Sequence, residues 1–207
     1  MLPLFLSVLT GYLLGSFPSG FVVGKCRGIN IRQHGSGNIG ATNVVRTLGR
    51  KWGVLVFALD VLKGILAVRL AMLLFPSGGA GLLTELGIPP GMWAGFGCFL
   101  GHCFPVWLGF KGGKGVAVGA GILIGLTPWV AVIGLTLWGI AFKVTRYVSL
   151  ASLIAAVSLP ITSWALYREV GALFWFTLIL SLIAIWRHRS NIQRLLAGTE
   201  SRFERKK

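Results

Sequence analysis

Residues 35–46 read Gly-Ser-Gly-Asn-Ile-Gly-Ala-Thr-Asn-Val-Val-Arg, a polar, glycine-rich run between two segments that are apolar enough to cross a bilayer. Glycine adopts positive φ angles without strain and lets backbone N–H groups approach a ligand closely. The run also carries short hydrogen-bonding side chains that can cap a helix, and Arg46 adds a permanent, forked cation. We therefore expect this loop to bind a phosphate group.

Two other interpretations of the run are a dinucleotide-binding loop and a flexible loop. Gly35, Gly37 and Gly40 match the spacing G-x-G-x-x-G, but a dinucleotide fold needs a strand before that motif and a βαβ unit around it. Membrane-spanning segments flank the run instead, so we reject the dinucleotide fold. A flexible loop is the simpler alternative, although polar groups at the end of a membrane helix are costly unless they are used.

The composition of the whole chain indicates an integral membrane protein. Of its 207 residues, 55% are hydrophobic and 12% are charged, which is more apolar than a soluble domain tolerates. The formal net charge of +15 comes from 20 Lys and Arg against five Asp and Glu and suggests nucleic acid as a first partner. Membrane topology explains the charge better, because basic loop residues mark the cytoplasmic side and contact anionic headgroups. We expect membrane lipid, and no nucleic acid, as a partner.

The cysteines and the first residues of the chain add two expectations. Cys26, Cys98 and Cys103 form no C-x-x-C pair, are odd in number and lie in or beside apolar segments, so we infer no disulfide framework and no zinc site. The first twenty residues are apolar and carry no basic residue at their start. We expect them to be retained as a membrane span.

Seven apolar segments are candidates for membrane spans, which predicts an all-α integral membrane protein with one transmembrane domain over residues 1–207. Spanning helices need about 20 apolar residues. The fourth and fifth segments form one apolar run, which we divide at Thr127-Pro128 because proline usually begins a helix. Without that division the number of spans is six. The expected spans cover residues 2–24, 53–75, 90–110, 116–127, 128–143, 148–167 and 171–186.

The charges of the loops predict the orientation of the chain. With seven spans, nearly all basic loop residues fall on one side, and the other side holds only Glu85, Arg168 and Glu169. We therefore expect the N-terminus outside and the C-terminus in the cytoplasm. Six spans would break this asymmetry. The tail, residues 200–207, is expected to be frayed or to rest on lipid headgroups.

A second glycine-framed cation precedes the fourth expected span. Residues 110–117 read Phe-Lys-Gly-Gly-Lys-Gly-Val-Ala, which is not a Walker A loop because the glycine spacing differs and Gly115 replaces the hydroxyl that would hold magnesium. Lys114 stands at the start of an apolar helix behind Gly112 and Gly113, an arrangement that favours an anion. An ordinary positive-inside lysine is the alternative.

Other polar residues are paired at a spacing of three, which places both members on one face of a helix. Ser149 and Ser152 could line one site, although serines that pack helices together are the simpler account. His188 and Asn191 would point the same way if a helix continued through them. A basic stop-transfer flank explains the arginines beside His188 but not the Asn.

Ionisable side chains also lie inside the expected spans. Asp60 and Lys63 are one helical turn apart, and a carboxylate there is a functional hypothesis, while a structural ion pair is at least as good an account. Their role stays open. His102 is expected to hydrogen-bond within the helix bundle.

Four motifs in this order resemble those of the bacterial acyl-phosphate-dependent glycerol-3-phosphate acyltransferases. They are Gly-Ser-Phe-Pro-Ser-Gly at 15–20, Gly-Ser-Gly-Asn-Ile-Gly-Ala-Thr-Asn at 35–43, Gly-His-Cys-Phe-Pro-Val-Trp at 101–107 with Gly-Gly-Lys-Gly-Val-Ala at 112–117, and His-Arg-Ser-Asn-Ile-Gln-Arg-Leu at 188–195. The resemblance implies transfer of a fatty acyl group from acyl phosphate to glycerol 3-phosphate, which gives lysophosphatidic acid in the first step of phospholipid synthesis. It also implies a multi-pass protein of the bacterial inner membrane whose motifs meet on the cytoplasmic side.

Carried over by position, the resemblance implies roles for individual residues. Lys114, His188 and Asn191 would be catalytic, and no cofactor or metal is implied. The substrate-binding residues would be Ser36, Gly37, Asn38, Gly40, Thr42, Asn43, Arg46, Gly112, Gly113, Ser149 and Ser152.

The residues present suit a donor that is already activated. No histidine is followed five residues later by an aspartate, so the His-x4-Asp pair of acyl-CoA-dependent glycerolipid acyltransferases is absent. Both expected substrates are phosphate anions, so cations and backbone amides suffice for much of the catalysis. The base is either His188 or a phosphate oxygen of the donor, and we favour the phosphate. Since no carboxylate cluster is available for magnesium, we expect activity without a metal.

A membrane transporter of an organic phosphate anion is the alternative function. Basic residues at broken helices would fit it, but transporters usually contain repeated halves and bind at the bilayer midplane, whereas these motifs lie at one end of the spans. A purely structural membrane subunit is weaker, because its polar residues would have no use. Acyl phosphate and glycerol 3-phosphate are the expected substrates, and no obligate protein partner is inferred.

Overall fold

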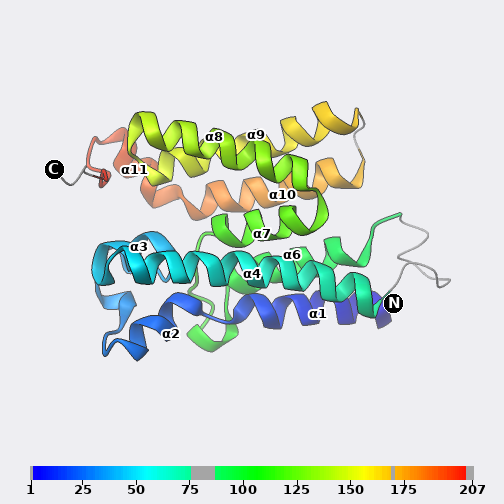
Figure 1. The fold of residues 1–207 in the computed structure, drawn as a ribbon, viewed down its shortest axis with the longest axis horizontal. Coiled ribbons are helices and arrows are strands. Elements are labelled where there is room, and N and C mark those ends of the chain that lie inside the picture. The colour runs from blue at the N-terminus through cyan, green and yellow to red at the C-terminus, as the bar shows by residue number, and fades with distance from the viewer. Residues whose placement is uncertain (1, 76–86, 169–170, 204–207) are drawn as a thin grey trace. The chain divides into compact units, whose positions relative to one another are not determined.

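The computed structural model describes residues 2–75, 87–168 and 171–203, and within these ranges the chain is helical with connecting loops (Figure 1). The chain divides into two compact units, Met1–Leu126 and Thr127–Lys207. The single domain over residues 1–207 stays a prediction.

The first unit is built around the long helix α4, against which α1, α6 and α7 pack (Figure 1). The shorter helices α2 and α3 and the 3₁₀ turn η1 also contact one another. The elements of this unit are α1 (Leu2–Ser16), α2 (Ser19–Cys26), η1 (Ile31–Gln33), α3 (Ala41–Leu48), α4 (Arg50–Leu74), α6 (Pro90–Cys103), η2 (Val106–Leu108) and α7 (Val116–Leu126).

Glycines set the distance between α1 and α6. A Cβ atom at Gly11 or Gly15 of α1 would collide with the α6 backbone, and one at Gly97 or Gly101 of α6 would collide with the α1 backbone. The contact between α4 and α7 uses glycines in the same way. Small residues let membrane helices approach until their backbones touch, and dispersion contacts and interhelical hydrogen bonds then hold them together.

Prolines mark three helix boundaries. Pro18 separates α1 from α2, so the expected first span is a broken helix. The helix α6 ends at Cys103, before Pro105, although the expected span ran on to residue 110. The helix α7 ends at Leu126 and α8 begins at Pro128, so the long apolar run is broken where we divided it. Proline lacks an N–H donor and disfavours helical geometry in the residue before it.

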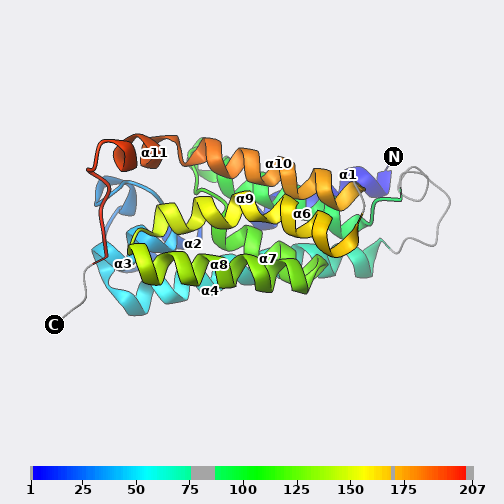
Figure 2. The same cartoon turned by 90° about the horizontal axis from the view of Figure 1, so that it is seen from above.

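In the second unit α8, α9 and α10 run side by side (Figure 2). Polar side chains join them: Trp138 donates through Nε1 to Ser152 Oγ at 3.1 Å between α8 and α9, and Ser181 Oγ donates to the Ala156 carbonyl at 2.6 Å between α10 and α9. Such bonds hold helices together where the surroundings are apolar. The elements are α8 (Pro128–Thr145), α9 (Val148–Tyr167), α10 (Ala172–Arg187) and α11 (Arg189–Leu196).

Part of the expected membrane topology is visible in the helices. Among the described residues, Leu2–Cys26, Pro128–Thr145 and Val148–Tyr167 are long and apolar enough to cross a bilayer, and α10 with α11 forms a fourth candidate if this bent pair is one span. Large apolar side chains, for example Leu73 and Val144, face outward, as lipid-facing residues do. Seven spans and the orientation of the termini stay predictions, and Glu85 and Glu169, used to predict that orientation, lie outside the described residues.

Candidate active site

The loop at residues 35–46 is organised by the buried side chain of Asn43. Its Nδ2 group donates to the carbonyls of Ile31, His34 and Asn38 at 3.2, 3.0 and 2.8 Å. Its Oδ1 atom accepts from the backbone N–H of Ser36 at 2.8 Å. A primary amide has two donor hydrogens, so two of the three carbonyls share one of them, and both ends of Asn43 are committed to the loop backbone. The structure places Asn43 inside the loop, in a position that supports the neighbouring residues.

Two of the three glycines adopt the conformation that we expected. Gly35 has a φ of 58° and Gly37 a φ of 69°, values that side chains disfavour. Gly40 instead has a φ of −75° and precedes the first residue of α3, where its N–H donates to Asn38 Oδ1 at 2.8 Å. The loop is therefore closed by its own asparagines, not left flexible.

An apolar base holds this loop in place while several polar side chains remain at its surface. The side chains of Ile31, Ile39 and Val44 are buried in a cluster with residues of α2 and α4. Arg46 and Ser36 are exposed, and Asn38 and Thr42 are half-buried. The predicted phosphate ligands thus lie on a segment whose backbone is held by the buried apolar side chains of Ile31, Ile39 and Val44. These side chains offer a guanidinium, hydroxyl groups and an amide, which are groups that suit a phosphate.

The second glycine-framed segment closes the end of α6. The N–H of Gly113 donates to the His102 carbonyl at 3.0 Å, and the N–H of Gly112 donates to the Cys103 carbonyl at 3.2 Å. Carbonyls in the last turn of a helix lack helical partners, and these two glycines supply them. The N–H groups of Gly112 and Gly113 are therefore bonded within the protein, and the assignment of these two glycines to the substrate stays a prediction.

Lys114 follows these glycines with a half-buried side chain. Gly115 has a φ of 87°, and a Cβ atom there would collide with the Phe99 ring. The helix α7 begins at the next residue, Val116. Close packing on both sides of Lys114 leaves room only for glycine at the neighbouring positions. Lys114 therefore stands just before the start of a helix whose dipole favours an anion.

A cluster in the second unit gathers around the carboxylate of Glu200, which sequence reasoning missed. Ser149 Oγ and Asn191 Nδ2 donate to its Oε1 atom at 2.8 and 2.7 Å, and Arg194 Nε donates to Oε2 at 2.7 Å. Burial alone would raise the pKa of Glu200, but the hydrogen bonds from Asn191, Ser149 and Arg194, with the charge of Arg194, hold it below its ordinary value. The signal available in the sequence was that Glu200 and Glu204 are the two acids of an otherwise basic segment.

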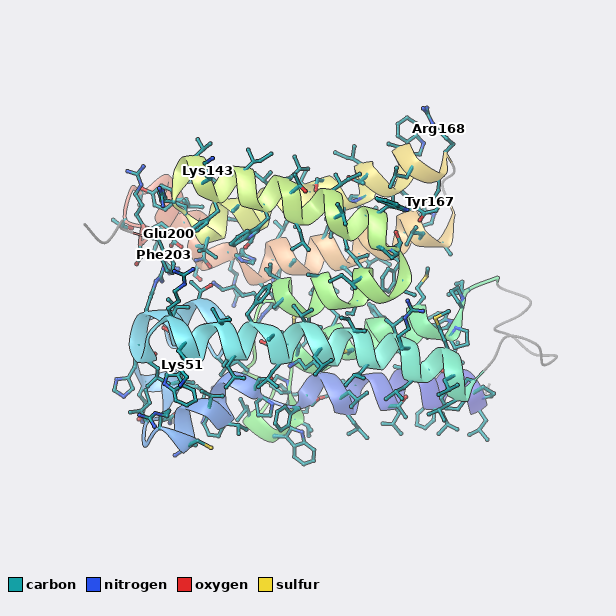
Figure 3. The ribbon with its side chains drawn as sticks, viewed as in Figure 1. Lys51, Lys143, Tyr167, Arg168, Glu200 and Phe203 are labelled. Atoms are coloured by element: carbon teal, nitrogen blue, oxygen red, sulfur yellow. The ribbon has the colours of Figure 1, made fainter. Side chains whose placement is uncertain are left out.

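The tail is consequently docked up to residue 203. Fraying, one of the two expectations, was wrong for residues 200–203, and contact with lipid headgroups stays a prediction. The N–H of Phe203 donates to the Arg146 carbonyl at 3.0 Å, and the Phe203 ring meets Phe142 edge-on at 5.8 Å. Figure 3 shows Glu200 and Phe203 at the end of the second unit where Lys143 lies, with Tyr167 and Arg168 at its other end. Residues 204–207 lie outside the described chain.

His188 forms the joint between α10 and α11, whose axes are bent by 58°. The helix does not continue through His188 and Asn191, so the condition for their shared face is not met. Both side chains are buried, and His188 Nδ1 lies 2.8 Å from the Ala184 carbonyl. Because a carbonyl only accepts, Nδ1 carries the hydrogen, and in the neutral ring Nε2 is the basic nitrogen.

The two serines of α9 have different partners. Ser149 is bonded to Glu200, whereas Ser152 Oγ donates to the Val148 carbonyl at 2.7 Å and accepts from Trp138. Helix packing therefore accounts for Ser152, and its role as a substrate ligand stays a prediction. Within the described ranges no three His, Cys, Asp or Glu side chains come together as metal ligands.

These features define an all-helical membrane protein with polar loops and buried polar clusters at helix ends. A family model described as glycerol-3-phosphate acyltransferase matches residues 5–198, and the chain belongs to this family, as its four motifs indicated. It is 45% identical to the glycerol-3-phosphate acyltransferase of Agrobacterium fabrum over 202 residues, 97% of this chain and 92% of the relative. It is also 45% identical to that of Gloeobacter violaceus over 193 residues, 93% of this chain and 91% of the relative.

Two crystal structures of PlsY (YgiH), an integral membrane glycerol 3-phosphate acyltransferase, share the fold. The glycerol 3-phosphate form superposes with a TM-score of 0.86 at 41% identity, covering 97% of this chain and 96% of that one. The lysophosphatidic acid form has a TM-score of 0.83 at 40% identity, covering 97% and 95%.

Proposed function

We propose that this protein transfers a fatty acyl group from acyl phosphate to glycerol 3-phosphate and releases lysophosphatidic acid and inorganic phosphate. The reaction would be the first step of phospholipid synthesis in the bacterial inner membrane. One observation carries the proposal: the fold is shared over 97% of the chain with an enzyme solved in a glycerol 3-phosphate form and in a lysophosphatidic acid form. These two molecules differ by one acyl group, so they are acceptor and product of a single transfer.

The reaction needs little covalent chemistry from the protein. A hydroxyl oxygen of glycerol 3-phosphate attacks the acyl carbon, the bond between that carbon and the phosphate oxygen breaks, and the phosphate leaves with the electron pair. The hydroxyl proton ends on the released phosphate, either directly or through a base. Because the acyl group is already activated, the protein mainly gathers two anions and orients the hydroxyl.

Arg46 and Lys114 are the cations that we assign to the substrate phosphates. Arg46 offers a planar fork of donors for two phosphate oxygens, whereas Lys114 offers a compact charge. Ser36, Asn38 and Thr42 are proposed to add neutral hydrogen-bonding groups, and their side chains are exposed or half-buried. The fixed backbone beneath them lowers the entropy that is lost when the ligand is ordered.

His188 and the donor phosphate remain the two candidate bases. The contact of Nδ1 with the Ala184 carbonyl leaves Nε2 as the atom that would accept a proton. A phosphate oxygen of the donor can take the same proton without any side chain, and we favour it. Asn191 would then assist catalysis by holding Glu200, to which its side chain donates.

The topology proposed with this function has seven spans, an outer N-terminus and a cytoplasmic C-terminus. Residues 25–51 carry several basic side chains, which favours the cytoplasmic side for the loop that holds Arg46. Water-soluble glycerol 3-phosphate would reach the site from there, while the acyl donor would come from the bilayer.

To test the proposal, purified protein in detergent is incubated with acyl phosphate and glycerol 3-phosphate. The release of phosphate and the formation of lysophosphatidic acid are then measured. We expect one phosphate per acyl group transferred, no product with glycerol as acceptor, and full activity in a chelator. Product from acyl-CoA but not from acyl phosphate would reject the donor. Uptake of glycerol 3-phosphate into vesicles without any chemistry would favour the transporter instead.

The base is tested by His188→Ala, with His188→Asn as the matched variant that keeps a polar group near the Ala184 carbonyl. If the donor phosphate is the base, both variants keep measurable turnover, because the proton does not pass through His188. If His188 is the base, its loss reduces the rate by a factor of about 10²–10⁴ or more. Complete loss of turnover with unchanged glycerol 3-phosphate binding would assign the base to His188.

A further inference from the structure

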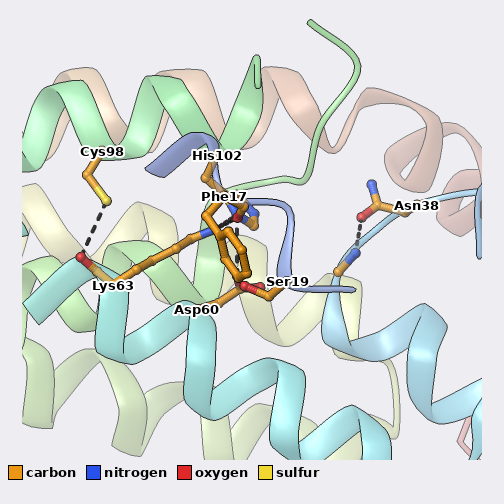
Figure 4. A network of polar contacts seen from close by, with 8 residues as sticks. Phe17, Ser19, Asn38, Asp60, Lys63, Cys98 and His102 are labelled. Atoms are coloured by element: carbon orange, nitrogen blue, oxygen red, sulfur yellow. Dashed lines mark hydrogen bonds and ion pairs between the residues drawn. The ribbon is translucent and has the colours of Figure 1, made fainter. Parts of the chain in front are cut away.

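Asp60 and Lys63 of α4 belong to a buried polar network (Figure 4). The ammonium group of Lys63 lies 2.9 Å from Asp60 Oδ1, 2.9 Å from the Phe17 carbonyl and 3.0 Å from His102 Nδ1. An ammonium group has three hydrogens and no acceptor, so these three contacts use all of them. Lys63 is therefore the donor to the imidazole, and in the neutral ring the hydrogen of His102 stands on Nε2.

The network joins three helix boundaries of the first unit. Phe17 lies in the break between α1 and α2, and Ser19, the first residue of α2, donates through Oγ to Asp60 Oδ1 at 2.9 Å. His102 stands in the last turn of α6. Buried charges are costly unless paired and fully hydrogen-bonded. A simple ion pair would need only Asp60 and Lys63, and this network extends beyond it to the imidazole.

His102 carries the network to the segment that holds Lys114. Its carbonyl accepts the N–H of Gly113 at 3.0 Å. The His102 ring also lies against Gly113, because a Cβ atom at Gly113 would collide with Nε2 of that ring. The ring and the carbonyl of one histidine thus define where Gly113 lies, and Lys114 is the next residue.

We propose that Lys63, held by Asp60, fixes the His102 ring against Gly113 and so positions Lys114 for the substrate phosphate. Lys63, Asp60 and His102 are positioning residues, since they act through the backbone at Gly113. The inference rests on the proposed role of Lys114. It predicts a defect in phosphate binding that is separable from stability.

The discriminating variant is the charge-neutral double substitution Asp60→Asn with Lys63→Met. Asparagine can still accept from Ser19, and methionine fills most of the lysine volume, so the two buried charges disappear together. The Phe17 carbonyl and His102 Nδ1 lose the Lys63 donor, so we expect a lower unfolding temperature, and KM is measured well below it, where the variant is folded. The KM for glycerol 3-phosphate should rise at least about tenfold, with a smaller change in kcat, because Lys114 is misplaced. Arg69→Met, an exposed cation on the same helix, is the control and should leave KM unchanged.

Combination with Lys114→Ala tests the route of the effect. If the network acts through Lys114, adding the double substitution to Lys114→Ala raises KM no further, whereas independent sites give multiplied effects. The shift in unfolding temperature caused by glycerol 3-phosphate gives the same comparison without turnover. A wild-type KM in the double variant, or multiplied effects with Lys114→Ala, would overturn the inference.

Failure of the underlying function would look different. Absence of lysophosphatidic acid from the wild-type protein would reject the proposed reaction. A wild-type response of Lys114→Ala to glycerol 3-phosphate would reject the role of Lys114, and the inference with it. If Lys114→Ala weakens the response to glycerol 3-phosphate but the double variant responds like the wild type, only the positioning role of Lys63, Asp60 and His102 would be overturned.

Discussion

The loop at residues 35–46 and the cluster around Glu200 are each organised by one buried polar side chain, yet the two side chains differ in kind. Asn43 is neutral and bonds to backbone groups only, three carbonyls and one N–H. Glu200 is a carboxylate and gathers side-chain donors from α9 and α11. The first fixes the path of a chain segment, and the second fixes the side chains of separate helices.

The difference follows from what each group can donate and accept. A carboxamide serves both N–H and C=O groups, so it can replace secondary structure in an irregular loop. An ionised carboxylate only accepts, so it needs donors from elsewhere and its bonds are charge-assisted. We therefore expect the loop to be sensitive to chemical substitution but not to pH, and the Glu200 cluster to be sensitive to both.

Asn43→Asp should have the largest effect. The substitution keeps the shape but places an acceptor where the amide NH₂ group donated to three carbonyls. The Ile31 and His34 carbonyls keep backbone N–H donors, but all three carbonyls lose the Asn43 bond and face a carboxylate oxygen. We expect a loss of more than about 3 kcal/mol in the free energy of unfolding, since each buried unsatisfied group costs about 1–3 kcal/mol. Denaturant unfolding in detergent measures it.

The matched control for that prediction is Asn30→Asp. Asn30 Oδ1 only accepts, from the N–H of Arg32 at 3.3 Å, and a carboxylate can do the same. Equal losses in the two variants would show that charge, and not donor geometry, governs the loop.

Glu200→Gln should be the next largest. The glutamine oxygen can still accept from Ser149 and Asn191, but its NH₂ group faces the Arg194 donor. We expect a loss of about 1.5–3 kcal/mol, the range for hydrogen bonds to charged groups. Arg202→Gln is the control in the same tail, because Arg202 is exposed, donates to the Thr145 carbonyl and lies over the Tyr147 ring, but has no bond to Glu200 among the described contacts. A loss in Arg202→Gln as large as in Glu200→Gln would indicate a general effect of charge in the tail.

The pH dependence separates the two regions further. The pKa of Glu200 is lower in the folded protein than its ordinary value of 4.5, so its contribution to stability is fully present above pH 4.5. That contribution is lost as the pH falls through the folded pKa. The stability gap between wild type and Glu200→Gln should therefore shrink on acidification below about pH 5. The gap between wild type and Asn43→Ser should stay constant, and unfolding temperatures from pH 7 to pH 3.5 test both. A gap for Glu200→Gln that does not change with pH would mean that the carboxylate is not ionised in the fold.

The sequence predicts those features of the two regions that depend on local properties of the chain, and not those that depend on hydrogen bonds between distant segments. Glycine spacing identified the loop at residues 35–46, and the apolar runs and Pro128 predicted the helices, because these are local properties. The partners of Asn43 and Glu200 depend on contacts between segments, so the sequence alone did not predict that Asn43 fixes the loop or that Glu200 docks the tail. The bonds from the Gly112 and Gly113 N–H groups to carbonyls at the end of α6 were not predicted for the same reason.

The smallest effect is expected from the two serines of α9, which test whether the Glu200 cluster faces a substrate. Ser149→Ala removes one donor from a carboxylate, and Ser152→Ala removes an acceptor from the Trp138 N–H. Each should cost about 1 kcal/mol of stability. Only Ser149→Ala should weaken the acid dependence, because only Ser149 bonds to Glu200. If Ser149 also touches substrate, its alanine variant raises the KM for one of the two substrates while Ser152→Ala does not. A raised KM in Ser152→Ala would show that helix packing is not the whole role of Ser152, and that both serines line one site.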